Sequence, residues 1–131
     1  MTLELSSDVM HAMLAHAGEA HPLECCGILF GAGDRIDGCA PAANVHGDPQ
    51  THFEIDPQAL VDAHRAAREG GKPVAGYYHS HPNGLPRPSA RDVALAAGDG
   101  AIWAIIAAGR VTLWRSGDGG FHALPYVVRQ R

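Results

Sequence analysis

The sequence predicts an α/β or α+β fold in which a mixed central β-sheet is flanked by helices. Apolar residues at helical spacing alternate along the chain with apolar stretches of strand length. Short glycine-containing turns join several of these stretches, which is typical of antiparallel hairpins. With 131 residues, 46% of them hydrophobic and 18% charged, the chain is expected to form one globular domain over residues 1–131.

The first half of the chain is expected to begin with a helix. Ser6 and Ser7 are candidate N-caps, and apolar side chains follow at helical spacing until about Gly18. Residues 25–30 are apolar on both faces, which predicts a strand inside the sheet. Residues 36–45 are expected to pair with it as a hairpin, and a short strand is expected at 52–55.

The second half begins with a clear helix start. Asp56 is a good N-cap and Pro57 suits the first helical position, so a helix is predicted to run from there to about residue 70. A strand at 74–81 and a short helix at 89–97 follow. Residues 101–108 and 111–115 predict a hairpin around Gly109 and Arg110, and a last strand is expected at 121–128.

The strand at 74–81 carries His79 and His81, two positions apart. Alternate side chains of a strand lie on one face, roughly 6–7 Å apart at their origins. Two imidazoles so placed can converge on one metal ion at about 2.0–2.1 Å from each nitrogen. Ser89 and Asp92 follow with the spacing of a helix capping box, which places Asp92 in a first helical turn near the histidines. Two histidines, one carboxylate and an open fourth position are typical of a catalytic zinc site.

Glu24 is the candidate general base for water at such a zinc ion. It stands at the start of the apolar run at 25–30, where a carboxylate is costly unless it has a partner. Ser89 has two interpretations that remain open together: its hydroxyl could only cap the helix, or it could also donate a hydrogen bond to an oxyanion.

This set of residues resembles the JAMM metalloprotease motif of MPN domains: Glu24, the His79-x-His81 pair, Ser89 and Asp92. Two segments look most like the small bacterial members: Glu-Cys-Cys-Gly at 24–27 and Gly-Tyr-Tyr-His-Ser-His-Pro at 76–82. The resemblance covers about residues 5–128. It implies an MPN-like fold with one zinc ion per chain. It also implies hydrolysis of an amide bond at the C-terminal tail of a ubiquitin-like protein, which for the small bacterial members is a sulfur carrier.

Other functions fit the sequence less well. A metal-free MPN-type scaffold that only binds a protein partner is disfavoured because the ligand set is complete. A RadC-like protein linked to DNA repair typically has Asn between the two histidines, where this chain has Ser80. A zinc deaminase would need a His-x-Glu with a downstream Pro-Cys-x-x-Cys, and the sequence does not contain this combination.

Several conspicuous residues are expected to be structural. Cys25 and Cys26 lie in the apolar run and should pack in the core. Strand alternation puts Tyr77, but not Tyr78, on the face of the histidines, where it could line a cleft. Four further histidines have no ligand-like spacing and are expected in loops or on the surface: His46, His52, His64 and His122.

Charge and cysteine content exclude some broad classes. The formal net charge is −4 and Lys72 is the only lysine, which argues against nucleic-acid binding. Three cysteines do not build a disulfide framework, and no apolar run is long enough to span a membrane. Because residues 1–4 also lack the pattern of a signal peptide, the cytoplasm is the expected compartment.

Overall fold

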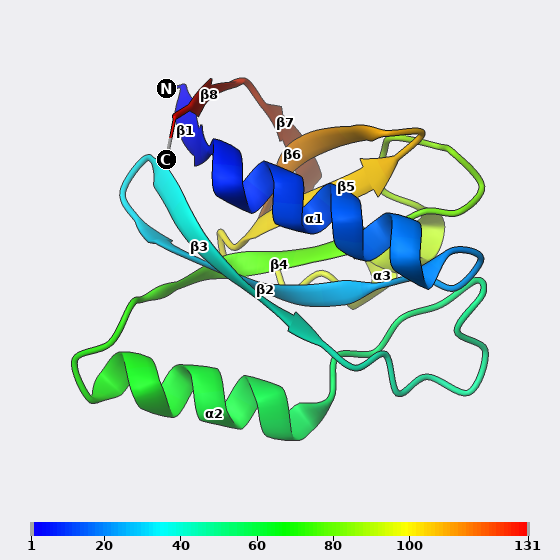
Figure 1. The fold of residues 1–131 in the computed structure, drawn as a ribbon, viewed down its shortest axis with the longest axis horizontal. Coiled ribbons are helices and arrows are strands. Elements are labelled where there is room, and N and C mark those ends of the chain that lie inside the picture. The colour runs from blue at the N-terminus through cyan, green and yellow to red at the C-terminus, as the bar shows by residue number, and fades with distance from the viewer. Residues whose placement is uncertain (1, 131) are drawn as a thin grey trace.

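A computed structural model describes residues 2–130, and the predicted limits of 1–131 thus include two residues outside this range. Its eight-stranded mixed sheet has the order β7-β6-β5-β4-β2-β3-β1-β8 (Figure 1). The expected sheet flanked by helices is therefore confirmed. The strands are β1 (Leu3–Ser6), β2 (Cys26–Ala32), β3 (Arg35–Ala42), β4 (Val74–Ser80), β5 (Ile102–Ala107), β6 (Arg110–Gly117), β7 (Gly120–Leu124) and β8 (Tyr126–Arg129). The helices are α1 (Ser7–Ala20), α2 (Pro57–Arg68) and α3 (Ala90–Leu95).

Strand β4 lies in the middle of the sheet. It pairs antiparallel with β2 on one side and parallel with β5 on the other, so both of its edges are occupied. The β2–β3 and β5–β6 pairs are antiparallel, as the predicted hairpins require. At the tight turn between β5 and β6, Ala108 and Gly109 both have positive φ, the conformation that two-residue hairpin turns need.

The two faces of the sheet have different roles. Helix α1 packs on one face, where Tyr78 is buried and its hydroxyl lies 2.7 Å from Nδ1 of His16. Because side chains alternate along β4, His79 points to the opposite face, the one it shares with Tyr77, and Tyr77 lines a cleft together with Leu60 of α2. The buried core around α1 includes Leu3, Leu5, Val9, Met13, Leu29, Ile36, Ala104, Ile106 and Leu113. Cys25 and Cys26 are 3% and 0% exposed, which confirms that they pack in the interior.

Two of the predicted strands are wrong. Residues 52–55 form only an isolated bridge between Ile55 and Asn44, because the Asn44 side chain takes main-chain bonds that a strand partner would otherwise make. The expected strand at 121–128 is two strands separated by Pro125, which has no N–H to continue a ladder. The short β1 was not expected; it pairs with β3 and β8 in parallel.

Strands β7 and β8 lie at opposite edges of the sheet although only Pro125 separates them. The sheet must therefore curl until its edges approach each other. Two hydrogen bonds fasten this closure. Leu3 N donates to Pro125 O at 3.0 Å, and the Tyr126 hydroxyl donates to Val111 O of β6 at 2.6 Å.

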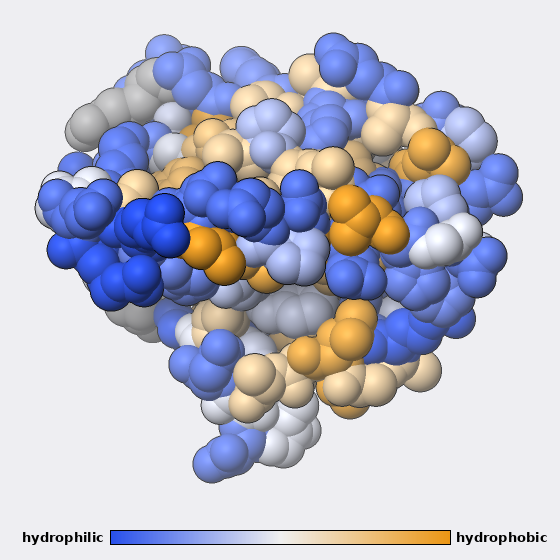
Figure 2. All heavy atoms as spheres, turned by 90° about the horizontal axis from the view of Figure 1, so that it is seen from below, coloured by the Kyte–Doolittle hydropathy of each residue, from blue (hydrophilic) through white to orange (hydrophobic). Residues whose placement is uncertain are grey.

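Seen from the side of α2, the surface is mainly hydrophilic, with apolar side chains in separate spots (Figure 2). Exposed apolar residues include Val61 of α2 and Val93 and Leu95 of α3. None of the helices within residues 2–130 has the length and apolar character needed to cross a bilayer.

Candidate active site

His79, His81 and Asp92 meet at the carboxyl end of β4. Their exposed fractions are 1%, 6% and 3%. The two Nε2 atoms lie 3.0 Å apart. Asp92 Oδ1 lies 3.1 Å from Nε2 of His79, and Asp92 Oδ2 lies 3.0 Å from Nε2 of His81. The structure thus brings together the three side chains that the sequence offers as metal ligands.

The donor set fits a tetrahedral cation such as zinc. Three ligand atoms about 2.0–2.1 Å from one ion stand about 3.3 Å apart in a tetrahedron, close to the separations seen here. His81 Nδ1 lies 2.8 Å from Leu85 O, which can only accept, so this nitrogen carries a proton. In the neutral ring, Nε2 of His81 then presents a lone pair to the carboxylate of Asp92. A cation between them removes that repulsion, and the bond to Leu85 orients the ring as partners of metal ligands do.

The pKa values of the three groups reflect the same crowding. Burial alone would raise the pKa of Asp92, but bonds with His79 and His81 outweigh it and hold the pKa well below its usual range. Burial lowers the pKa of His79. Burial also acts to lower the pKa of His81, yet the bonds to Asp92 and Leu85 raise it. In the absence of a cation, His81 binds a proton where the metal ion would otherwise bind. Metal binding must displace this proton, so the affinity for the metal rises with pH.

Glu24 lies on the same face of the sheet as the histidines. Cys26 of β2 pairs with His79 of β4, and the same register extended by two residues sets Glu24 opposite His81. Its exposed fraction is 8%. Desolvation by burial raises its pKa to about 7, although the nearby His81 opposes the shift. A carboxyl group with this pKa can take up and release a proton near neutral pH.

Ser89 is the N-cap of α3. Its Oγ accepts a hydrogen bond from Asp92 N at 3.1 Å, and its own N–H donates to Asp92 Oδ2 at 2.8 Å. The predicted capping box is therefore confirmed, and it orients the Asp92 carboxylate as well as the helix. Ser89 lines the cleft together with Glu24 and Asp92, so the cap is compatible with the catalytic role, which stays a prediction.

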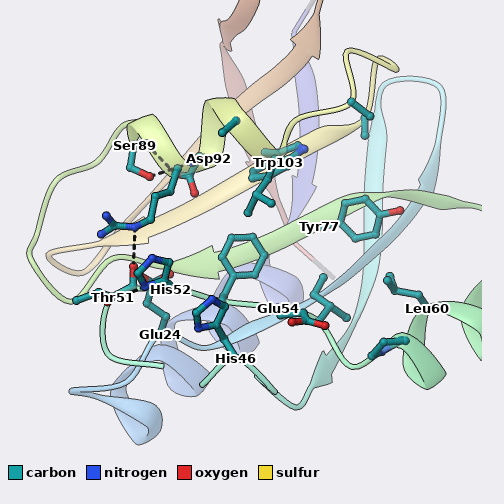
Figure 3. A pocket seen from close by; sticks show the side chains of 18 of the residues that line it. Glu24, His46, Thr51, His52, Glu54, Leu60, Tyr77, Ser89, Asp92 and Trp103 are labelled. Atoms are coloured by element: carbon teal, nitrogen blue, oxygen red, sulfur yellow. Dashed lines mark hydrogen bonds between the residues drawn. The ribbon is translucent and has the colours of Figure 1, made fainter. Parts of the chain in front are cut away.

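The site opens into a cleft of about 830 Å³ between α2, α3 and the loop before α2 (Figure 3). Tyr77 lines it and Tyr78 does not, as strand alternation predicts. Arg91 Nε donates to Thr51 O at 3.2 Å and ties α3 to the loop on the other side of the cleft.

Sequence reasoning missed two residues that support the site. The ring of Phe53 stacks on that of His79, with centroids 4.2 Å apart and 17° between the planes. Asn44 Nδ2 donates to Glu24 O at 2.9 Å, while Glu24 N donates to Pro49 O at 2.7 Å. The loop thus holds the backbone of Glu24 from both sides. No motif signals either residue, because each acts through the loop conformation.

Comparison with known proteins gives consistent matches. The family model described as prokaryotic homologs of the JAB domain matches residues 6–117. The chain is 35% identical over 117 residues to the desampylase of Haloferax volcanii, covering 84% of each chain. It is 32% identical over 106 residues to the CysO-cysteine peptidase of Mycobacterium tuberculosis, covering 79% of this chain and 72% of that one. A solution structure of a Desulfitobacterium hafniense protein superposes with a TM-score of 0.85 at 30% identity, over 99% of this chain and 94% of that one.

Proposed function

The chain belongs to the prokaryotic homologues of the JAB domain, the JAMM/MPN metallopeptidases, and from this we propose its reaction and site. We propose that it is a zinc-dependent peptidase that hydrolyses an amide bond at the C-terminal tail of a ubiquitin-like protein of sulfur-carrier type. The related CysO-cysteine peptidase and desampylase support this substrate class. The observation that carries the chemistry is the buried convergence of His79, His81 and Asp92 on one point, with Glu24 beside it.

We assign His79, His81 and Asp92 as the ligands of one zinc ion per chain. Zinc held there would supply Lewis acidity and lower the pKa of a water molecule to about 7. The chain's own residues supply the proton transfers and the orientation. Glu24 takes the proton of the attacking water and later gives a proton to the leaving amine, for which its pKa of about 7 is suited.

Ser89 is assigned to the oxyanion. Its Oγ accepts the hydrogen bond from Asp92 N, which leaves its own hydroxyl proton to be donated into the cleft. A donor fixed in this way needs little reorganisation when negative charge develops on the carbonyl oxygen of the scissile amide. The cap and the catalytic role therefore use different parts of one hydroxyl group.

The tail of the substrate is expected to lie along the cleft rather than to extend the sheet at the histidines. Both edges of β4 are already paired, so no main-chain edge is open there. The cleft is lined by apolar and aromatic side chains that include Phe53, Tyr77 and Trp103. An extended, narrow tail fits such a cleft, with the scissile bond between Glu24 and Ser89.

We also propose that residues 1–131 act as one domain in the cytoplasm. The use of residues 3–6 and 126–129 in the same sheet supports a single domain.

The test combines metal content with hydrolysis. Purified protein should contain about one zinc per chain by mass spectrometry, and the His79→Ala/His81→Ala double variant should lose it. The zinc-loaded protein should release the C-terminal group from ubiquitin-like carriers extended at their C-terminus. Glu24→Gln should keep the zinc and lose hydrolysis. A folded protein that takes up no zinc would leave a protein-binding scaffold as its function instead.

A further inference from the structure

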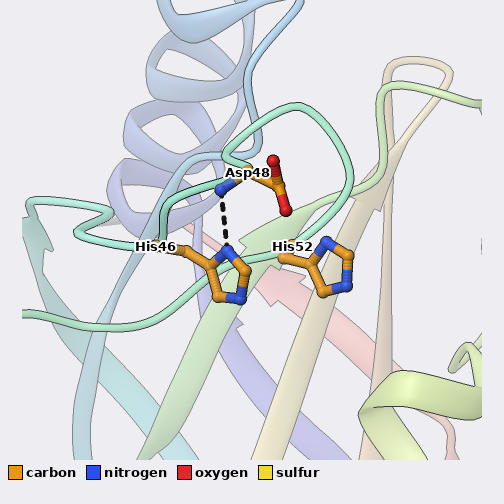
Figure 4. Close-up of side chains that lie close together, drawn as sticks. All are labelled: His46, Asp48 and His52. Carbon is orange, nitrogen blue, oxygen red and sulfur yellow. Dashed lines mark hydrogen bonds between the residues drawn. The ribbon is translucent and has the colours of Figure 1, made fainter.

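The loop between β3 and α2 gathers a second set of metal-ligating side chains, His46, Asp48 and His52 (Figure 4). One ligand atom from each lies within 4.8 Å of the others. The two imidazole rings are stacked, with centroids 4.5 Å apart and 7° between their planes. The sequence predicts loop or surface positions for these histidines, and the loop conformation alone brings them together.

The side-chain amide of Asn44 makes several of the hydrogen bonds that hold the loop in this shape. Asn44 Nδ2 donates to His52 O at 3.0 Å in addition to its bond with Glu24 O. Asn44 Oδ1 accepts from His46 N and Glu54 N, both at 3.1 Å. The backbones of both histidines are thereby fixed before any ligand arrives, which lowers the entropy lost on binding.

The protonation of the cluster also suits a cation. His46 Nδ1 accepts a hydrogen bond from Asp48 N at 2.9 Å, so this nitrogen carries a lone pair rather than a proton. His52 Nδ1 lies 2.8 Å from the Thr51 hydroxyl, a partner that can orient the ring. Coordination would replace the bond from Asp48 N and turn the stacked rings toward a common point. Two imidazoles and one carboxylate are donors that suit Zn²⁺, Co²⁺, Ni²⁺ or Cu²⁺.

We propose that His46, Asp48 and His52 form a second site for a divalent transition-metal ion at the mouth of the cleft. This site is weaker than the buried one, because Asp48 is exposed and the two histidines are only half-buried. His46 and His52 also line the catalytic cleft, and Pro49, which follows Asp48, accepts the hydrogen bond from Glu24 N. A cation here therefore fastens the segment that holds the general base.

Titration of metal-free protein with Co²⁺ tests this site, with bound metal counted by calorimetry and the ligand field followed by visible absorption. Wild-type protein should bind two Co²⁺ per chain, the second more weakly. His46→Asn/His52→Asn should lose the weaker one and keep the other. The control His11→Asn/His122→Asn removes two exposed histidines elsewhere and should still bind two. A second Co²⁺ that persists in the loop variant, or a wild type whose only Co²⁺ also persists in that variant, would overturn the proposal.

A further variant separates this site from the proposed catalytic one. Asp92→Asn should lose the more tightly bound Co²⁺ and keep the more weakly bound one. Adding His46→Asn/His52→Asn to this variant should then remove the weakly bound Co²⁺ as well. Wild-type protein that binds the loop cation but does not hydrolyse the extended carriers would contradict the proposed function alone. Loss of both Co²⁺ ions from the folded loop variant would overturn the second site.

Discussion

The carboxyl group of Glu24 couples the chemistry of the site to the stability of the fold. In metal-free protein, burial raises its pKa from 4.5 to about 7. The folded state therefore binds this proton more strongly than the unfolded chain does. The resulting stabilisation is fully present below pH 4.5 and is lost as the pH rises through about 7.

Glu24→Gln should remove this pH dependence. In chelator-treated protein, the free energy of unfolding of wild type should fall between about pH 5 and pH 8 by roughly 1–3 kcal/mol more than that of the Gln variant. The size follows because one pKa unit corresponds to about 1.4 kcal/mol. Urea unfolding at the two pH values measures it. Glu69→Gln, which changes an exposed acid after α2, is the control and should follow wild type. An equal response of the Glu24 variant and wild type would contradict the buried carboxyl.

Substitutions at Ser89 can separate its two roles. Ser89→Ala should cost about 1 kcal/mol of stability through the lost cap and reduce kcat about ten- to a thousandfold through the lost oxyanion donor. Ser89→Asn keeps a capping acceptor without the hydroxyl, so it should restore stability but not kcat. Ser89→Thr keeps both. Unfolding curves and initial rates on one extended carrier provide the readout, and normal kcat in the Asn variant would reduce Ser89 to a cap.

At the scale of residues, the convergence of His79, His81 and Asp92 could be predicted because their geometry is local. Two histidines on one strand share a face whatever the rest of the chain does, and the capping box fixes Asp92 within its own helix. Glu24 could be suggested only by chemistry, since its approach to His81 depends on the β2–β4 register. Phe53 and Asn44 could not be predicted, because both contacts depend on the path of an irregular loop.

Among the elements, β4 leaves almost no room beside β5. A Cβ on Gly76 would lie 1.8 Å from Ile102 O, a backbone atom that cannot move aside, whereas a Cβ on Gly18 of α1 would meet nothing within 4 Å. Gly76→Ala should therefore destabilise the protein by several kcal/mol, about the level of severe core substitutions. Gly18→Ala should stabilise it by about 0.5–1 kcal/mol. Thermal unfolding of the two variants measures both effects, and similar shifts in one direction would contradict the packing of β4 on β5.

The elements that sequence reasoning placed well carry their own signals. Helix α2 has Asp56 accepting from Gln58 N and Pro57 in its first turn, and α1 follows the apolar spacing. The missed strand β1 has four residues and exists only through its parallel partners, which no local pattern reveals. The segment at 121–128 looks continuous in sequence, but Pro125 sends its two halves to opposite edges of the sheet.

For the molecule as a whole, the predicted metal site is a source of stability as well as activity. A cation that binds only the folded state at one hundred times its Kd adds about 2.7 kcal/mol. Chelation should therefore lower the Tm of wild-type protein by roughly 5–10 °C, at a few degrees per kcal/mol. Asp92→Asn should show little response to chelation. Scanning calorimetry with and without zinc tests this, and a Tm indifferent to chelation would argue against a metal held by the fold.

The pairing of β1 with β8 has a kinetic consequence. It joins parts of the chain nearly its full length apart: Arg129 Nε lies 3.3 Å from Glu4 Oε1, with 125 residues of separation. Such non-local contacts are slow to form because the entropy of closing a long loop must be overcome first. Docking of β8 should then follow the rate-limiting step of folding. Tyr126→Phe, which removes the bond to Val111 O, should accelerate unfolding about two- to tenfold and leave the refolding rate in stopped-flow experiments unchanged.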